Sequence, residues 1–277
     1  MATIAQLTDL HLVESNYAQR RLESRARLQY LSFGRALVPE ARRGRVASAL
    51  REVWMRNVDH LLITGDLTED GHQEQFEVLA ELLAESRIPP ERVTLVPGNH
   101  DAYIDEGGFA QALRGPLRAY AATSSIAAAL QFRDVTIVPV STAFQQSPLR
   151  SAGAIASREL ASLAAIAMDP ALAGHPIVFA QHHPPGAAFI PLLQWLDGLT
   201  DHSALSDLFR RCPHLYVLHG HTHKCSDKSA CGEEVARVFS AQAVVDSAWP
   251  LRLYEASPAG VRPLEPDPAC EALAQAG

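Results

Sequence analysis

One short apolar run in this chain ends abruptly in polar residues: Val93-Thr94-Leu95-Val96-Pro97-Gly98-Asn99-His100-Asp101. A brief run of β-branched and apolar side chains bounded by turn residues is typical of a buried strand. Gly98 suits a position where the strand must turn sharply and bring its backbone close to another group. Three polar side chains therefore follow directly where a buried strand ends.

Four other apolar runs end in the same way, in turns that carry carboxylate or imidazole side chains. These turns are Asp9-Leu10-His11, Gly65-Asp66, His182-His183-Pro184-Pro185 and Gly220-His221-Thr222-His223. Open α/β sheets form their binding crevice at the carboxyl ends of the strands. We therefore expect all five turns to meet along one edge of the fold.

Segments of helical period alternate with these runs, as in layered α/β proteins. Val46, Leu50 and Val53 lie on one face of an expected helix, and the stripe Phe76, Leu79, Leu82, Leu83 marks another. Residues 134–140 and 235–240 are expected to form further strands. With 277 residues, of which 47% are hydrophobic, the chain can bury a substantial core. We predict one α/β domain over residues 1–257 and a mobile tail over 258–277.

The composition excludes several classes of protein. The formal net charge of −7 argues against binding to nucleic-acid polymers, which requires a dominant basic surface. The N-terminus lacks the features of a secretory signal, and the chain has no apolar run long enough to span a bilayer. The four cysteines are scattered without a close C-x-x-C pair, so we expect free thiols. These features predict a cytoplasmic protein.

The polar residues of the five turns form a set of metal ligands. Two metal ions about 3.5 to 4 Å apart need a shared anionic bridge and a mixture of imidazole nitrogens and hard oxygens, with an open position for water. The aspartates, the asparagine and the histidines of the turns supply such a set. Ligands of this kind suit two divalent ions, with Mn²⁺ or iron favoured and Zn²⁺ as a further candidate.

The order of the five blocks, D-x-H, G-D, G-N-H-D, H-H-P-P and G-H-x-H, resembles the calcineurin-like metallophosphoesterase superfamily from Asp9 to His223. Within it, the blocks and the length resemble the class III cyclic-nucleotide phosphodiesterases. The resemblance implies an α/β fold in the form of a four-layer α/β/β/α sandwich. Two mixed sheets would be flanked by helices, with a dinuclear metal site at the strand ends.

The resemblance also implies a role for each residue of the motifs. One metal ion would be held by Asp9, His11 and His223, and Asp66 would bridge both ions. The ligands of the second ion would be Asn99, His182 and His221. His100 resembles the histidine that binds phosphate or protonates the leaving oxygen, with Asp101 as its orienting carboxylate. His183 is a candidate pocket residue, and His219 is expected to point away from the site.

The implied reaction is hydrolysis of a P–O bond. Two cations lower the pKa of a bridging water, so that hydroxide can attack the phosphorus in line, and they neutralise charge on the phosphoryl oxygens. His100 could then donate a proton to the departing alkoxide. The substrate would be a small phosphodiester or diphosphate.

The segment from about Tyr17 to Arg45 carries eight arginines and only two acidic residues, so it has a local net charge of about +6. It could be an amphipathic insertion that keeps its arginines in water. It could instead cap an anionic substrate, with Arg42 and Arg43 lining the pocket. A third interpretation is peripheral contact with an anionic membrane surface, such as the inner membrane.

These interpretations leave three hypotheses for function. The first is a phosphodiesterase acting on a cyclic nucleotide. The second is a pyrophosphatase of the UDP-2,3-diacylglucosamine type in lipid A synthesis, with the basic segment at the membrane. The third is a non-catalytic scaffold with the same fold, whose expected signature, loss of ligands, is not found in this sequence.

Overall fold

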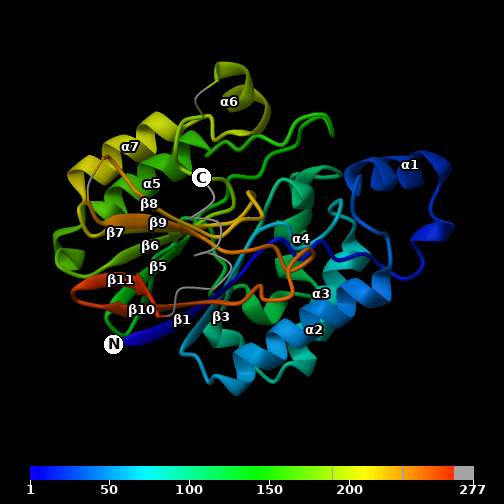
Figure 1. The fold of residues 1–277 in the computed structure, drawn as a ribbon, viewed down its shortest axis with the longest axis horizontal. Helices are drawn as coiled ribbons and strands as arrows, with labels where there is room; N and C mark the ends of the chain where they lie inside the picture. The colour runs from blue at the N-terminus through cyan, green and yellow to red at the C-terminus, as the bar shows by residue number, and fades with distance from the viewer. Residues whose placement is uncertain (189, 233, 265–277) are drawn as a thin grey trace.

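The computed structural model describes residues 1–188, 190–232 and 234–264. Two β-sheets lie face to face in the middle of the molecule, and helices cover their outer faces (Figure 1). The predicted α/β/β/α sandwich is therefore confirmed.

The first sheet has five strands in the order β11-β10-β1-β2-β3. Their bounds are β1 Ala2–Leu7, β2 His60–Thr64, β3 Val93–Val96, β10 Arg252–Ser257 and β11 Gly260–Pro263. Strands β1, β2 and β3 are parallel, whereas β10 runs antiparallel to both β1 and β11. The ends of the three parallel strands thus lie at one edge of the sheet.

The second sheet has six strands in the order β4-β5-β6-β7-β9-β8. Their bounds are β4 Leu130–Phe132, β5 Val135–Pro139, β6 Ile177–Ala180, β7 Leu215–His219, β8 Ser226–Ser229 and β9 Ala236–Ser240. The four central strands, β5, β6, β7 and β9, are parallel, and antiparallel strands close both edges.

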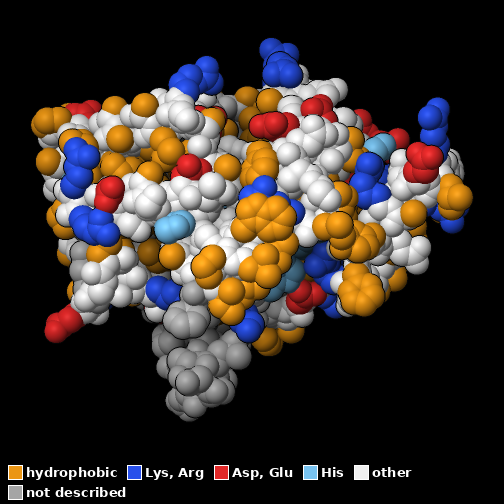
Figure 2. Space-filling view, turned by 90° about the horizontal axis from the view of Figure 1, so that it is seen from above, with side chains coloured by type: hydrophobic (Ala, Val, Ile, Leu, Met, Phe, Trp, Pro, Cys, Tyr) orange, Lys and Arg blue, Asp and Glu red, His pale blue; other side chains and the backbone are white. Residues whose placement is uncertain are grey.

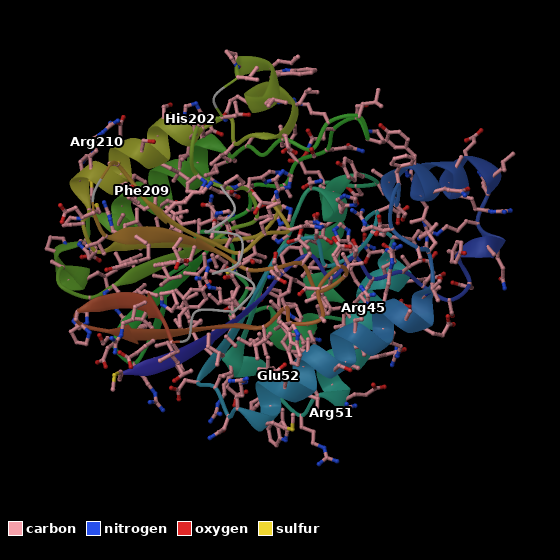
Figure 3. The ribbon with its side chains drawn as sticks, viewed as in Figure 1. Arg45, Arg51, Glu52, His202, Phe209 and Arg210 are labelled. Carbon is pink, nitrogen blue, oxygen red and sulfur yellow. The ribbon has the colours of Figure 1, made fainter. Side chains whose placement is uncertain are left out.

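The helices are α1 Leu22–Leu31, α2 Pro39–Met55, α3 Gln73–Glu85, α4 Gly108–Arg114, α5 Ser157–Ala167, α6 Pro191–Asp197 and α7 His202–Arg211. Helices α2, α3 and α4 pack against the first sheet and α5 and α7 against the second, whereas α6 contributes no buried residue. Short 3-10 turns lie at Tyr17–Gln19, Pro90–Arg92, His100–Ala102, Arg118–Tyr120 and Pro170–Leu172. Helix α2, with the labelled Glu52, and helix α7, with the labelled Phe209, lie on opposite sides of the two sheets (Figure 3).

The core follows from the alternation of side chains along each strand. On β2, Leu62 faces the other sheet, whereas Leu61 and Ile63 face helices α2 and α3. On β6, Val178 faces the first sheet and Phe179 faces α5 and α7. Because both faces of the central strands are buried, these strands are continuous apolar runs in the sequence.

Several expectations can be compared with this fold. Strand β11 follows the domain boundary predicted at residue 257, and the rest of the predicted tail, 265–277, lies outside the described residues. Cys212 and Cys231 are free, as expected, whereas Cys225 is disulfide-bonded, against the expectation. Within the described residues, no helix is both long and apolar enough to cross a membrane.

The basic segment 17–45 forms α1 and the start of α2, and several of its arginines are not in water. Arg20 pairs with the buried acids Glu14 and Asp70, and Arg42 is itself buried. The interpretation in which the arginines stay solvated is therefore wrong for these two residues. Their charges are matched by carboxylates from other parts of the chain, which a local count of charge does not include.

Replacing Leu79 by Ala should destabilise the protein by about 2 to 5 kcal/mol, because this α3 side chain is fully buried and its loss leaves a cavity. The matched change Leu22→Ala removes a side chain that is 76% exposed on α1 and should change stability by about 0.5 kcal/mol or less. Urea unfolding of both variants measures the difference. Equal losses of stability would contradict the assigned core.

Candidate metal centre

The five predicted turns meet at one edge of the molecule, where the parallel strands of both sheets end. Backbone hydrogen bonds hold them together. The Asp9 N–H donates to the Gly65 carbonyl at 3.1 Å, and the His11 N–H donates to the Asp66 carbonyl at 2.9 Å. The Gly220 N–H donates to the His182 carbonyl at 3.0 Å. The convergence predicted from the strand ends is present in the structure.

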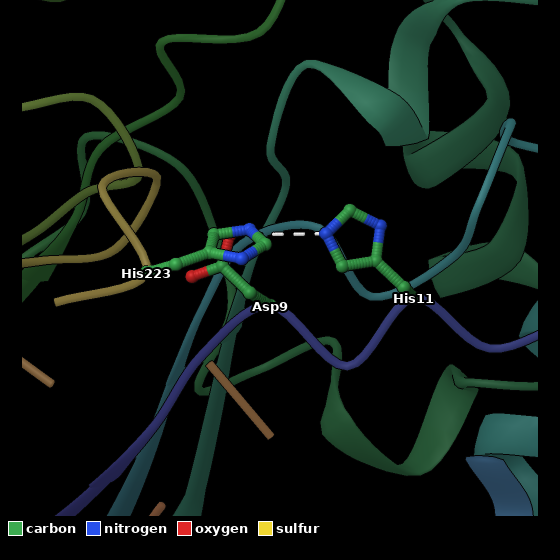
Figure 4. Close-up of side chains that lie close together, drawn as sticks. All are labelled: Asp9, His11 and His223. Atoms are coloured by element: carbon green, nitrogen blue, oxygen red, sulfur yellow. Dashed lines mark ion pairs between the residues drawn. The ribbon is translucent and has the colours of Figure 1, made fainter. Parts of the chain in front are cut away.

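Asp9, His11 and His223 form one cluster of ligand atoms that lie within 4.8 Å of one another (Figure 4). The Asp9 Oδ1 atom lies 3.3 Å from His223 Nε2 and 4.0 Å from His11 Nε2. Asp9 and His11 follow β1 of the first sheet, and His223 follows β7 of the second. The cluster therefore joins the two sheets.

Asp66 occupies the centre of the site. Its Oδ2 atom lies 3.3 Å from His182 Nε2 and 3.7 Å from His11 Nε2. Its Oδ1 atom accepts a hydrogen bond from the His100 backbone N–H at 2.9 Å. Asp66 belongs both to a group with His11 and His100 and to a group with Asp9 and His182. One buried carboxylate thus touches each part of the centre.

The second group of predicted ligands also comes together. Asn99 Oδ1 lies 3.1 Å from His182 Nε2, and the His221 ring lies 5.1 Å from the His182 ring. Asn99 donates from Nδ2 to the Tyr103 hydroxyl at 3.0 Å, and that hydroxyl donates to the Arg150 carbonyl at 3.0 Å. Tyr103 therefore fixes the amide so that its oxygen faces the site.

His100 and Asp101 have different surroundings from those the sequence suggested. His100 Nδ1 donates to the Glu69 carbonyl at 2.6 Å, so its orienting acceptor is a backbone oxygen and not the Asp101 carboxylate. Asp101 instead accepts hydrogen bonds from the N–H groups of Leu67, Thr68 and Gly98. It ties the turn after β2 to the turn after β3. His100 Nε2 lies 4.0 Å from Asp66 Oδ2, about as far as a ligand atom of the cluster would lie. Its role as a proton donor and not a metal ligand therefore rests on the family resemblance and not on this distance.

The other nitrogens of the site imidazoles are held by acceptors that sequence reasoning missed. His182 Nδ1 donates to the Thr64 carbonyl at 2.9 Å, and His223 Nδ1 lies 2.5 Å from the Asp246 carboxylate. His221 Nε2 lies 2.9 Å from the carboxylate of Asp197, at the end of α6. Such outer acceptors set the tautomer and orientation of metal-binding histidines. Neither aspartate lies in a recognisable motif, so only the fold reveals them.

The backbone of the site is strained at the ligand positions. Asp9, His11, Asp66, His221 and His223 all have left-handed φ values, between 47° and 70°. Non-glycine residues rarely adopt this conformation, and it persists where surrounding structure enforces it, often at functional sites. Gly98 packs so closely that an added Cβ would overlap the Asp66 carboxylate. The strain and the close packing both place side chains inward.

The charges of the site are strongly coupled. Burial opposes ionisation of Asp66, but the His182 and His100 imidazoles hold the pKa of Asp66 well below its usual value. Burial likewise disfavours protonated His182 and His223, but their carboxylate neighbours outweigh this and raise each pKa to about 9. Burial lowers the pKa of His11 to about 4, so its imidazole is neutral at neutral pH.

The remaining predicted pocket residues, His183, Arg42 and Arg43, already bind other groups of the protein. His183 is fully buried, with Nδ1 2.7 Å from the Thr142 hydroxyl and Nε2 2.8 Å from the Ser151 carbonyl. Arg42 binds Glu69 and the His11 carbonyl, and Arg43 binds Glu81 and Glu85 of α3. His219 is buried and donates from Nδ1 to the Gly220 carbonyl, outside the clusters described above.

The residues present fit two divalent cations. Asp9 Oδ1 and both ring nitrogens of His11 are buried and have no hydrogen-bond partner among the described residues, and His11 Nδ1 has only an ion-pair contact, at 3.3 Å, with Glu69 Oε2. Their surroundings offer carboxylate and amide oxygens together with imidazole nitrogens, the donor types preferred by Mn²⁺, iron and Zn²⁺. A dinuclear site requires buried ligand atoms of this kind, without hydrogen-bond partners and gathered around one carboxylate, here that of Asp66.

A surface rich in apolar side chains lies beside the centre. Figure 2 views the face to which α6 contributes, and hydrophobic side chains gather there. Exposed members on α6 are Leu192, Leu193 and Trp195, and the Arg150 guanidinium lies 5.0 Å from the Trp195 ring. Since Asp197 of α6 holds His221, this apolar surface adjoins the metal centre.

Comparison with known proteins agrees with this geometry. Residues 2–225 match the family profile described as calcineurin-like phosphoesterase. A Rhodococcus erythropolis protein named a probable cyclic nucleotide phosphodiesterase is 27% identical over 237 residues, covering 84% of this chain and 68% of that protein.

Two solved structures show the same fold at low sequence identity. A dimetal phosphatase from Danio rerio has a TM-score of 0.63 and 12% identity, covering 95% of this chain and 98% of its own. A purple acid phosphatase from yellow lupin seeds has a TM-score of 0.51 and 10% identity, covering 86% of this chain and 43% of its own.

The stability of the metal-free protein should fall as pH rises from about 6.5 to 9. His182 and His223 have a pKa of about 9 when folded and an ordinary value near 6.5 when unfolded, so the folded state holds extra protons in this window. Metal binding must displace those protons, so the stabilisation by Mn²⁺ should grow over the same window. Melting curves with and without Mn²⁺ measure both slopes. A metal-free melting temperature that rises with pH would contradict the assignment.

Proposed function

The chain belongs to the calcineurin-like phosphoesterase family, and on this premise we propose that it hydrolyses a phosphodiester of the cyclic-nucleotide type. It is a metallophosphoesterase, a hydrolase with candidate ligands for two metal ions. The observation that carries the proposal is the position of Asp66, whose buried Oδ2 atom lies 3.7 Å from His11 Nε2 and 3.3 Å from His182 Nε2, one proposed ligand of each ion.

In this proposal Asp9, His11 and His223 would hold one cation and Asn99, His182 and His221 would hold the other, with Asp66 as a ligand that both would share. When bound, the two cations, Mn²⁺ or iron in our proposal, supply Lewis acidity towards the phosphoryl oxygens and activate a water molecule. Most of the proposed ligand side chains are buried, whereas His100 beside them is partly exposed and can meet the phosphoryl group.

His100 is proposed to supply the proton for the leaving oxygen. The Glu69 carbonyl retains the proton on Nδ1, so only Nε2 can exchange a proton with a substrate. In the imidazolium form, Nε2–H would donate its proton to the departing alkoxide as the P–O bond breaks, and the neutral ring would remain. His100 is 12% exposed, so its ring can meet a substrate.

Two observations support a small diester over a lipid-linked diphosphate. The Rhodococcus erythropolis relative is named a probable cyclic nucleotide phosphodiesterase. In addition, Arg20, Arg35 and Arg42 of the basic segment bind protein carboxylates, which reduces the charge available to a diphosphate. The diphosphate alternative is supported by the exposed Leu22 and Phe33 at α1, which could contact a membrane.

A substrate panel distinguishes the two candidates. With Mn²⁺ present, we expect hydrolysis of 3′,5′-cyclic AMP and of bis-p-nitrophenyl phosphate to exceed hydrolysis of UDP-2,3-diacylglucosamine and of simple monoesters. Product formation is followed by chromatography. Preferential cleavage of the diacylglucosamine nucleotide would replace the proposed substrate, and inactivity on every phosphoester would contradict the proposed function.

His100→Ala should lower kcat on a substrate with a poor leaving group by about 100-fold or more, because the alkoxide would depart without its proton. The loss should be smaller for p-nitrophenyl esters, whose leaving group is a weak base. Both metal ions should remain bound. The control His175→Ala removes an exposed histidine outside the motifs, which precedes β6 and so lies at the opposite end of that strand from His182. Unchanged turnover of the poor leaving group in His100→Ala would eliminate the role.

A further inference from the structure

Glu69 is a buried carboxylate that none of the motifs includes. It is fully buried, and its Oε2 atom lies 3.3 Å from His11 Nδ1. Its own backbone carbonyl accepts the hydrogen bond from His100 Nδ1. One residue therefore touches both a proposed ligand of the first metal ion and the proposed proton donor.

The backbone fixes Glu69 in this position. The turn after β2 runs beside the turn after β1, and the Leu12 N–H donates to the Leu67 carbonyl at 3.2 Å. The Glu69 N–H donates back to the Leu12 carbonyl at 3.0 Å. This ladder places the Glu69 side chain next to His11, so their contact does not depend on a flexible segment.

The charge of Glu69 is balanced by the basic segment. Arg35 Nη2 lies 2.8 Å from Oε1, and Arg42 Nη1 contacts Oε2. Arg42 Nη1 also donates to the His11 carbonyl at 2.7 Å. An unpaired carboxylate is costly to bury, so these two guanidinium groups allow Glu69 to stay ionised beside His11.

The contact has a consequence for His11. Its Nε2 atom faces Asp9 and Asp66, and its Nδ1 atom faces Glu69. A carboxylate beside Nδ1 favours the tautomer with the proton on Nδ1, which leaves the lone pair of Nε2 directed into the site. The carboxylate also makes the imidazole a stronger donor to a metal ion.

We propose that Glu69, held by Arg35 and Arg42, is a positioning residue that orients His11 for the first metal ion. The basic segment 17–45 then supports the metal centre by supplying the two arginines that hold Glu69. In this proposal it does not cap the substrate. This inference rests on the proposed dinuclear site. It assigns a part in that site to a segment that contributes no ligand.

The test is Glu69→Gln, which keeps the size of the side chain and removes its charge. The matched control is Glu52→Gln, since Glu52 is also paired with an arginine, Arg56, at 3.0 Å, but this pair lies at the end of α2 on the outside of the first sheet (Figure 3). Calorimetric titration with Mn²⁺ measures the affinity of each site. Nitrogen-15 NMR of the metal-free protein, assigned with His11→Gln, reports the tautomer of His11.

In Glu69→Gln we expect one Mn²⁺ to bind about 10-fold to 100-fold more weakly and the other to change by about threefold or less. The His11 signals should shift from the Nδ1–H tautomer towards a mixture. Glu52→Gln should match the wild type in both measurements. Unchanged Mn²⁺ affinities and an unchanged His11 tautomer in Glu69→Gln would overturn the proposal.

If Glu69→Gln does not fold, Arg35→Gln provides the test, because Arg35 is 18% exposed and leaves Arg42 as a partner of Glu69. It should weaken the same Mn²⁺ ion by about 3-fold to 10-fold, and wild-type affinity would overturn the proposal. Titration of the wild type distinguishes failure of this proposal from failure of the proposed function. If the wild type binds fewer than two Mn²⁺ ions, the dinuclear site itself is contradicted.

Discussion

The buried negative charge of Asp66 is the interaction on which the rest of the centre depends. A carboxylate with 2% of its surface exposed can remain ionised only among positive charges, N–H donors or metal ions. Asp66 follows β2 of the first sheet, and the imidazole nearest to its Oδ2 atom, His182, follows β6 of the second. The need to compensate the charge of Asp66 therefore keeps the strand ends of the two sheets close together.

The backbone strain of the site explains why two of its motifs have the same spacing. In Asp9-Leu10-His11 and in His221-Thr222-His223, both outer residues have left-handed φ values. This arrangement directs alternate side chains of each turn into the site. Each such residue costs about 1 to 3 kcal/mol, which tertiary contacts must offset. The Asp9 and His11 backbone hydrogen bonds to the turn after β2 are contacts of this kind.

Much of the fold and the inner part of the centre could be predicted because both depend on local patterns. Buried strands are continuous apolar runs, and the polar residue after each run marks the strand end at the site. Leu61 to Ile63 followed by Asp66 is an example. Short strands such as β8, with the sequence Ser226 to Ser229, carry no apolar signal and were not predicted.

The outer residues could not be predicted because their roles depend on distant segments. Asp246 meets His223 across 23 positions, and Asp197 meets His221 only because the end of α6 reaches the turn after β7. The basic segment shows the same difficulty. Its charge is evident in the sequence, but the acids that neutralise Arg20 and Arg42 lie in the turns after β1 and β2.

The outer acceptors also decide which nitrogen each imidazole turns towards the site. Asp246 faces Nδ1 of His223, Thr64 faces Nδ1 of His182, and in both rings Nε2 faces the central carboxylates. His221 is reversed, because Asp197 faces its Nε2 and leaves Nδ1 as the nitrogen that could bind a metal ion. The two histidines of the second group therefore present different ring nitrogens to the site, Nε2 from His182 and Nδ1 from His221. Since Asp197 ends α6, the orientation of His221 is coupled to the apolar surface beside the centre, whereas that of His11 is coupled to the basic segment on the other side.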